Sequence, residues 1–243
     1  MADFLDYQEL AKRYGLEPLP ENVLQLTRLV AQQEADLDEM AWIISRDATL
    51  ARRLVHAVNP WTKNERVCGM GTVREALLRT GVRCILLLAM SAPLALALAR
   101  TFRTMLGLEL KKLPLELEPP FLGEQLLCAI GFSGKADGKV FLRLSPDGAR
   151  RVTAAMLQAK PEKITQDAEI NDAIGELLNM VTGNLKSNLC DAGLDCQLHT
   201  PLVGRTRKFE IESVPGGGWE RAVFHAPGIL LFVDLTVNPW GGK

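Results

Sequence analysis

Through roughly the first ninety residues, apolar side chains recur every three to four positions, the spacing that places them on one face of a helix. One apolar stripe follows Pro20, which suits the first turn of a helix. Two more follow Asp36 and Asp47, whose carboxylates can accept hydrogen bonds from the free N–H groups of a first turn. Thr72–Glu75 forms a capping box before a further apolar run that stops near Gly81. The pattern predicts an entirely helical region, with no strand before about residue 85.

The longest uncharged run, Cys84–Ala99, has 16 residues and lies between two arginines. A membrane-spanning helix needs roughly 20 apolar residues, so this run is too short to cross a bilayer. It predicts a buried helix that breaks near Pro93, because a proline ring interrupts the helical hydrogen bonds. Helical spacing also covers Ala92–Leu106, and Gly107 is placed to end that helix.

After residue 107 the pattern changes to alternating apolar and polar positions, which are typical of strands. Leu108–Glu118 predicts a half-exposed strand that Pro114 weakens. Leu126–Phe132 predicts a buried strand, and the glycines of Gly134–Gly138 supply a hairpin turn back into Val140–Leu144. We therefore expect sheet only after about residue 108.

The rest of the chain combines two helices with further strands. Ser145 or Asp147 can cap a helix that runs to about Gln158, and a long helix extends from Asp167 to about Ala192. Four strand candidates follow: Cys196–Val203, Lys208–Val214, Trp219–Phe224 and Ile229–Val237. This order of elements predicts the α+β class, with an antiparallel sheet whose helices pack against one face.

Composition and charge exclude some classes of partner. The chain has 28 Lys and Arg against 29 Asp and Glu, for a formal net charge of −1, and only 6% aromatic residues. It therefore lacks both the basic excess needed to bind phosphate backbones and the rings needed to stack bases, so we expect no nucleic-acid partner. The five cysteines include no CxxC pair, and the N-terminus carries no basic, apolar signal segment, so we expect a cytoplasmic protein.

One segment of the predicted long helix, Asn171–Lys186, carries the candidate chemistry. Its apolar positions form a core stripe: Ile174, Leu177, Leu178, Val181 and Leu185. Glu176 and Asn179 lie three residues apart and share a different face, where they present a carboxylate and an amide side by side. Gly175 and Gly183 flank the pair, and because each glycine costs a helix about 1 kcal/mol, they suggest the close approach of another backbone. Spacing alone leaves two interpretations open: a solvated pair on an exposed helix, or a functional site.

The first part of the chain resembles the HDOD domain, an all-helical signalling module. The resemblance covers roughly residues 15–100 and rests on these segments: Leu19–Pro20, Ile43–Ile44, Asp47–Leu50, Arg53–Leu54, Asn59, Thr72–Ala76 and Gly81. The family's domain continues well beyond this length, so we expect a truncated HDOD-like region. The related HD phosphohydrolases need a His-Asp metal cluster, but none of the three histidines here is followed by Asp. His56, on an apolar helical stripe, is expected to be a packing residue rather than a metal ligand.

The segment Gly175–Lys186 resembles the signature helix of the CheC/CheX/FliY phosphatases of bacterial chemotaxis, in which ExxN is followed by Met and a Gly-Asn dipeptide. Its flanks agree, since Gly131–Leu142 resembles the family's first hairpin, Ala149–Met156 the next helix, and Pro201–Arg205 the strand after the long helix. The resemblance covers about residues 90–238 and is closest to CheX, because only one helix bears ExxN. We expect two domains, an HDOD-like helical region at 1–88 and a CheX-like domain at 89–243.

This resemblance implies a phosphatase of phospho-aspartate response regulators such as phosphorylated CheY. Asn179 would position the attacking water, and Glu176 would pair with the regulator's lysine beside the phosphoryl group. Gly183 and Asn184 would support the helix or the rim of the site. The chain would need no cofactor of its own, since the Mg²⁺ would be the regulator's, and CheX-like proteins are often dimers, so we expect a homodimer. The alternatives are a non-catalytic module that binds a receiver domain and an HD-type metal phosphohydrolase, against which the missing His-Asp pairs argue.

Overall fold

The computed structural model describes these residues of the chain: 22, 25, 26, 29, 36–48, 50–52, 54, 70–80, 83–113, 123–191, 194–209 and 218–238. They are called the described residues. His56, the packing residue expected from the sequence, lies outside them.

The N-terminal region is helical wherever it is described, apart from the cap residue Asp36 and the turn Arg46–Asp47, as its pattern predicts. Its longer helices are α3 (Leu37–Ser45), α5 (Met70–Thr80) and α6 (Arg83–Leu106). Asp36 caps α3 by accepting a hydrogen bond from the Asp38 N–H at 2.9 Å. Asp47 accepts one from the Leu50 N–H at 3.0 Å, so both predicted caps are confirmed.

Two predictions for this region are wrong. α5 begins at Met70, so Thr72 lies inside the helix and not at its N-cap. α6 continues through Pro93 without a break, although the proline ring removes one backbone hydrogen bond. Its buried face packs against the sheet and against the long helix α8 (Asp167–Asp191), and this packing holds α6 together across the proline. α6 ends as predicted, at Gly107, which has a φ of 66°.

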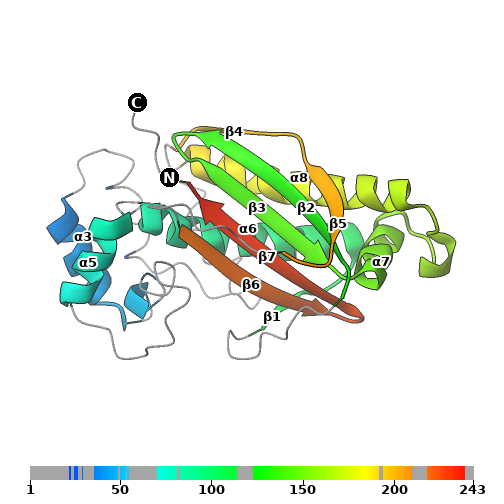
Figure 1. Cartoon of the computed structure of the whole chain (residues 1–243), viewed down its shortest axis with the longest axis horizontal. Coiled ribbons are helices and arrows are strands. Elements are labelled where there is room, and N and C mark those ends of the chain that lie inside the picture. The colour runs from blue at the N-terminus through cyan, green and yellow to red at the C-terminus, as the bar shows by residue number, and fades with distance from the viewer. Residues whose placement is uncertain are drawn as a thin grey trace.

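The described strands form one seven-stranded antiparallel sheet (Figure 1). They are β1 (Lys111–Lys112), β2 (Gln125–Gly134), β3 (Gly138–Leu144), β4 (Cys196–Leu198), β5 (Leu202–Thr206), β6 (Gly218–Ala226) and β7 (Ile229–Val237). Their order across the sheet is β1-β6-β7-β3-β2, and both β4 and β5 pair with β2 at the far edge. No described residue before Lys111 is in a strand, as the sequence predicts.

The strand predictions hold for β2, β3, β6 and β7 and fail in part elsewhere. Cys196–Val203 is two strands and not one, because the three residues His199–Pro201 stand opposite only two residues of β2 and break the pairing. Leu108–Glu118 is a strand only at Lys111–Lys112 among its described residues, and 114–118 lie outside them. Of the predicted strand Lys208–Val214, the first two residues are not in a strand and the rest lie outside the described residues.

Three helices, α6, α7 (Pro146–Met156) and α8, cover one face of the sheet and lie behind it in Figure 1. Alternate side chains of a strand point to opposite faces, and β3 shows which face is the core, since these of its residues are fully buried: Val140, Leu142 and Leu144. Ser145 caps α7 by accepting a hydrogen bond from the Gly148 N–H at 3.0 Å. The predicted α+β fold with helices on one face is confirmed. None of the described helices is both long and apolar enough to cross a membrane.

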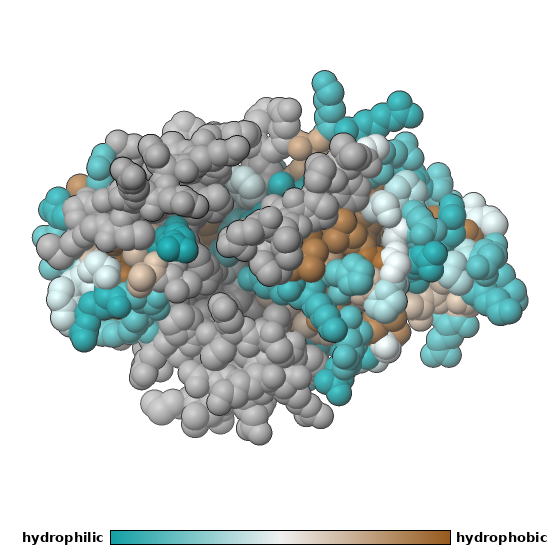
Figure 2. Space-filling model, turned by 90° about the horizontal axis from the view of Figure 1, so that it is seen from below, coloured by the Kyte–Doolittle hydropathy of each residue, from teal (hydrophilic) through white to brown (hydrophobic). Residues whose placement is uncertain are grey.

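Large apolar side chains are seldom exposed among the described residues. Figure 2 shows a face on which hydrophobic colour gathers near the middle, among hydrophilic residues. The exposed ones are spread over the fold: Trp42 of α3, Leu78 of α5, Met105 of α6, Leu157 just after α7, and Leu202 of β5. They therefore do not follow one helix or strand that would offer an apolar docking face.

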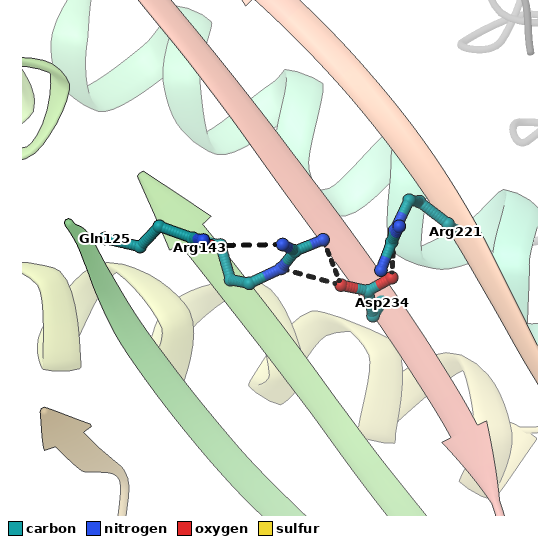
Figure 3. A network of polar contacts seen from close by, with 4 residues as sticks. All are labelled: Gln125, Arg143, Arg221 and Asp234. Carbon is teal, nitrogen blue, oxygen red and sulfur yellow. Dashed lines mark hydrogen bonds and ion pairs between the residues drawn. The ribbon is translucent and has the colours of Figure 1, made fainter. Parts of the chain in front are cut away.

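The face of the sheet opposite the helices carries a buried network of charged side chains (Figure 3). Asp234 on β7 is fully buried and lies 3.0 Å from Arg143 on β3 and 2.5 Å from Arg221 on β6. Arg143 also donates to Gln125 on β2 at 3.1 Å, and its guanidinium stacks on the rings of Phe209 and Phe232. The network thus links side chains from four neighbouring strands, with Asp234 between the two arginines.

A strained residue, Gln158, follows α7. Gln158 has a φ of 51°, in the left-handed region that favours glycine. The turn is a Schellman motif, in which the Ala159 N–H donates to the Ala154 carbonyl at 2.8 Å. Glutamine therefore occupies the position at which this motif most often has glycine.

We expect Asp234→Ala to destabilise the protein by about 3–5 kcal/mol, because two guanidinium groups lose their carboxylate inside the protein. Urea denaturation followed by circular dichroism measures the free energy of unfolding. Lys139→Ala, at an exposed position of β3, is the control and should change it by at most about 0.5 kcal/mol. Equal stability of the two variants would contradict the role of the network.

We expect Gln158→Gly to raise the free energy of unfolding by about 0.5–1 kcal/mol, because relief of the left-handed strain exceeds the extra chain entropy of glycine. Thermal melting is the measurement. Lys160→Gly is the matched control, since Lys160 has an ordinary φ of −82° and glycine gains nothing there. A lower melting temperature for Gln158→Gly would contradict the strain argument.

Candidate functional site

α8 buries the apolar stripe that the sequence predicts. Each of these residues is at most 1% exposed: Ile174, Leu177, Leu178, Val181 and Leu185. Glu176 and Asn179 lie off this stripe and are both exposed. None of the described N-terminal residues buries them, so the pair is open to a partner.

Helical geometry decides which predicted site residues lie together. At 3.6 residues per turn, Gly183 lies about 20° from Glu176 and about 40° from Asn179 around the axis of α8. Asn184 is exposed as well, but it lies about 140° from Asn179. The structure thus groups the exposed Glu176 and Asn179 with the half-buried Gly183 in one stripe, called the site stripe, and leaves Asn184 outside it.

The two glycines of α8 have different surroundings. A Cβ at Gly175 would lie 3.6 Å from Val203 and 3.8 Å from Pro201, which are ordinary van der Waals distances. A Cβ at Gly183 would meet nothing within 4 Å. At Gly183, the close backbone approach suggested by the sequence is therefore absent among the described residues. At Gly175 the neighbours leave room for a methyl group.

The charged side chain of the site stripe is available for an outside partner. Asp167, in the first turn of α8, pairs with Arg205 of β5 at 2.5 Å. In contrast, the side chains of Glu176 and Asn179 have no hydrogen-bond or ion-pair partner among the described residues. A carboxylate and an amide without internal partners can accept or donate hydrogen bonds to another molecule without first losing a contact.

Two of the described thiols, Cys128 and Cys196, are buried and are not available as nucleophiles. Burial raises the pKa of Cys128 to about 12, and burial is also the main cause that raises the pKa of Cys196. Both thiols stay protonated at neutral pH, whereas the thiolate is the reactive form. The described residues also hold no group of three or more His, Cys, Asp and Glu that could bind a metal ion.

The fold also brings together two residues that the sequence analysis did not select. Ser133 Oγ of β2 lies 2.9 Å from Nε2 of His199, which follows β4. No described carboxylate orients the imidazole, so the pair lacks the third group of a hydrolase triad. Their 66-residue separation leaves no local motif by which the sequence could have indicated the contact.

Comparison with known proteins identifies two regions. Residues 126–218 match the family model described as "Chemotaxis phosphatase CheX", and residues 16–113 match that of the HDOD domain. The CheX match includes the whole of α8 and the site stripe. Both resemblances noted in the sequence are therefore confirmed, while the division at residues 88 and 89 stays a prediction. No curated protein matches the chain.

Solved structures agree with the CheX match. The chemotaxis protein CheX from Vibrio vulnificus is 25% identical with a TM-score of 0.53, over 61% of this chain and 96% of that one. A CheC-like superfamily protein from a Shewanella species is 26% identical with a TM-score of 0.53, over 62% and 97%. CheX from Desulfovibrio desulfuricans, at 20% identity and a TM-score of 0.52, shares the fold. The chain is thus similar to CheX-like proteins over nearly their whole length.

We expect the protein to keep its fold without metal, because the described residues offer no cluster of ligands. EDTA should leave the melting temperature unchanged, with EDTA presaturated with Mg²⁺ as the control. Elemental analysis of the untreated protein is the second measurement. Stoichiometric zinc or iron, together with a lower melting temperature in EDTA, would contradict the prediction.

Proposed function

We propose that this chain dephosphorylates phospho-aspartate response regulators of the CheY type. The observation that supports this most is the exposed pair Glu176 and Asn179, on the helix that the CheX family model covers. Neither side chain has a partner among the described residues. The pair lies on a rigid support, since the opposite side of α8 is packed into the core.

Asn179 is proposed to position the attacking water. Hydrolysis of an acyl phosphate needs one water in line with the phosphorus, opposite the aspartyl oxygen whose bond breaks. The products are the free aspartate carboxylate and inorganic phosphate. An amide can hold this water by hydrogen bonds without acting as a base, because little covalent chemistry is required of the enzyme. The absence of a nucleophile from the site stripe therefore agrees with the proposal.

Glu176 is proposed to pair with the lysine of the regulator beside its phosphoryl group. Such a charge pair would fix how the two proteins dock, and would place Asn179 over the phosphorus. The Mg²⁺ in the reaction would belong to the regulator, so this chain supplies none of its ligands. The homodimer and the cytoplasmic location expected from the sequence stay predictions.

We expect Asn179→Ala to lose most of the acceleration of phosphate release while it keeps binding, because its contact matters mainly in the transition state. Glu176→Ala should instead weaken binding by about 1–3 kcal/mol, with a lower rate as the consequence. The measurements are phosphate release from a phosphorylated CheY-type receiver domain of the same organism, and binding of its beryllofluoride adduct.

The controls separate the enzyme from its alternative. Both substitutions are at exposed positions and should change the free energy of unfolding by at most about 0.5 kcal/mol. Asn184→Ala, also exposed on α8 but outside the site stripe, is a further comparison for the rate. Equal rates for wild type and Asn179→Ala would contradict the mechanism. Binding without acceleration by the wild type would identify a non-catalytic receiver-binding module.

A further inference from the structure

Gly183 is a glycine for which the described residues give no packing reason. It lies within a 25-residue helix, where only proline is less favourable than glycine. A side chain there would point into open space, since a Cβ meets no atom within 4 Å. Gly183 has a helical backbone, and it is absent from the residues with positive φ. Neither packing among the described residues nor backbone conformation therefore requires glycine here.

Gly175, on the same helix, does have neighbours within the chain. It is buried, and it faces Pro201 and Val203 at the start of β5. Gly183 lies two turns further along and belongs to the site stripe, next to Asn179. A glycine beside Asn179, with open space around its Cα, leaves room there for the close approach of another molecule.

The short side chain of Asn179 gives a reason for a glycine at position 183. The amide of asparagine is only two carbons from the backbone, so α8 must come close to any phosphoryl group on which Asn179 acts. A large side chain at Gly183, one turn away and about 40° around the axis, would reach as far as the amide. It would meet the partner first and hold Asn179 back.

We propose that Gly183 is the point at which the phosphorylated receiver domain contacts the backbone of α8, and that its missing side chain sets how closely Asn179 approaches the phosphoryl group. The proposal rests on the proposed phosphatase function and adds a docking contact to it. The partner surface is the rim of the receiver's phosphorylation site, which must fit against a helix backbone at this point. Gly183 is then a positioning residue, which acts through Asn179.

A series at Gly183 tests the contact. Gly183→Leu should raise the dissociation constant of the beryllofluoride adduct of a CheY-type receiver by about tenfold or more, and Gly183→Ala by less. The turnover number for phosphate release should fall as well, because Asn179 is held away. Both variants should melt at or above the wild-type temperature, since alanine and leucine favour helix more than glycine. Loss of binding therefore cannot be assigned to unfolding.

Gly175→Ala is the matched control. It makes the same change on the same helix, at a position with room for a methyl group inside the chain. It should raise the melting temperature and leave the dissociation constant unchanged. A dissociation constant for Gly183→Leu within about twofold of wild type would overturn the proposed contact.

The failures of the two proposals are distinguishable. If the wild type speeds phosphate release and Gly183→Leu matches it in binding and rate, the contact is wrong and the phosphatase function stands. If the wild type binds the adduct without speeding phosphate release, the function is wrong, and the binding series still decides the contact at Gly183. A wild type that binds no receiver domain of its organism overturns both.

Discussion

Five apolar side chains on one side of α8 are at most 1% exposed, and the need to bury them sets the position of everything on the opposite side. Full burial of one such side chain contributes about 1.5–3 kcal/mol. Rotating α8 enough to hide Glu176 and Asn179 would expose several of the five, at a cost comparable with the whole stability of an ordinary domain. The helix therefore has one orientation on the sheet and α6. The carboxylate and the amide face solvent because the apolar side of α8 must stay buried.

The two faces of the sheet are held together by different forces. On the helical face, alternate residues of the long strands β2, β3, β6 and β7 join an apolar core. On the other face, Asp234 brings the positive charges of Arg143 and Arg221 together across β3, β7 and β6. A buried ion pair often contributes little net stability, but it penalises any register that separates the charges. The network thus fixes which residues stand opposite one another in the sheet that supports α8.

Most of the fold can be predicted from sequence patterns within a few residues. The rest depends on contacts between residues that are distant in sequence. The residues that form the apolar stripe of α8 and the caps at Asp36 and Asp47 lie close together in sequence, so the sequence predicts these features. The unbroken α6 depends on packing against α8 and the sheet, which overrides the local effect of Pro93. The charge network joins residues up to 109 positions apart, Gln125 to Asp234, and no periodicity indicates such a link. Within the site, the exposure of Glu176 followed from the pattern, whereas the empty space at Gly183 required coordinates.

α6 belongs to both of the regions that sequence comparison separates. The HDOD match runs through it to residue 113, yet its buried face lies against α8 and the sheet of the CheX-like part. One continuous apolar cluster extends from Leu26 to Val237. The described parts of two regions that match different family models therefore share a single interior here. A change in the packing of the N-terminal helices can therefore be transmitted through α6 to the buried side of α8, the helix that bears Asn179.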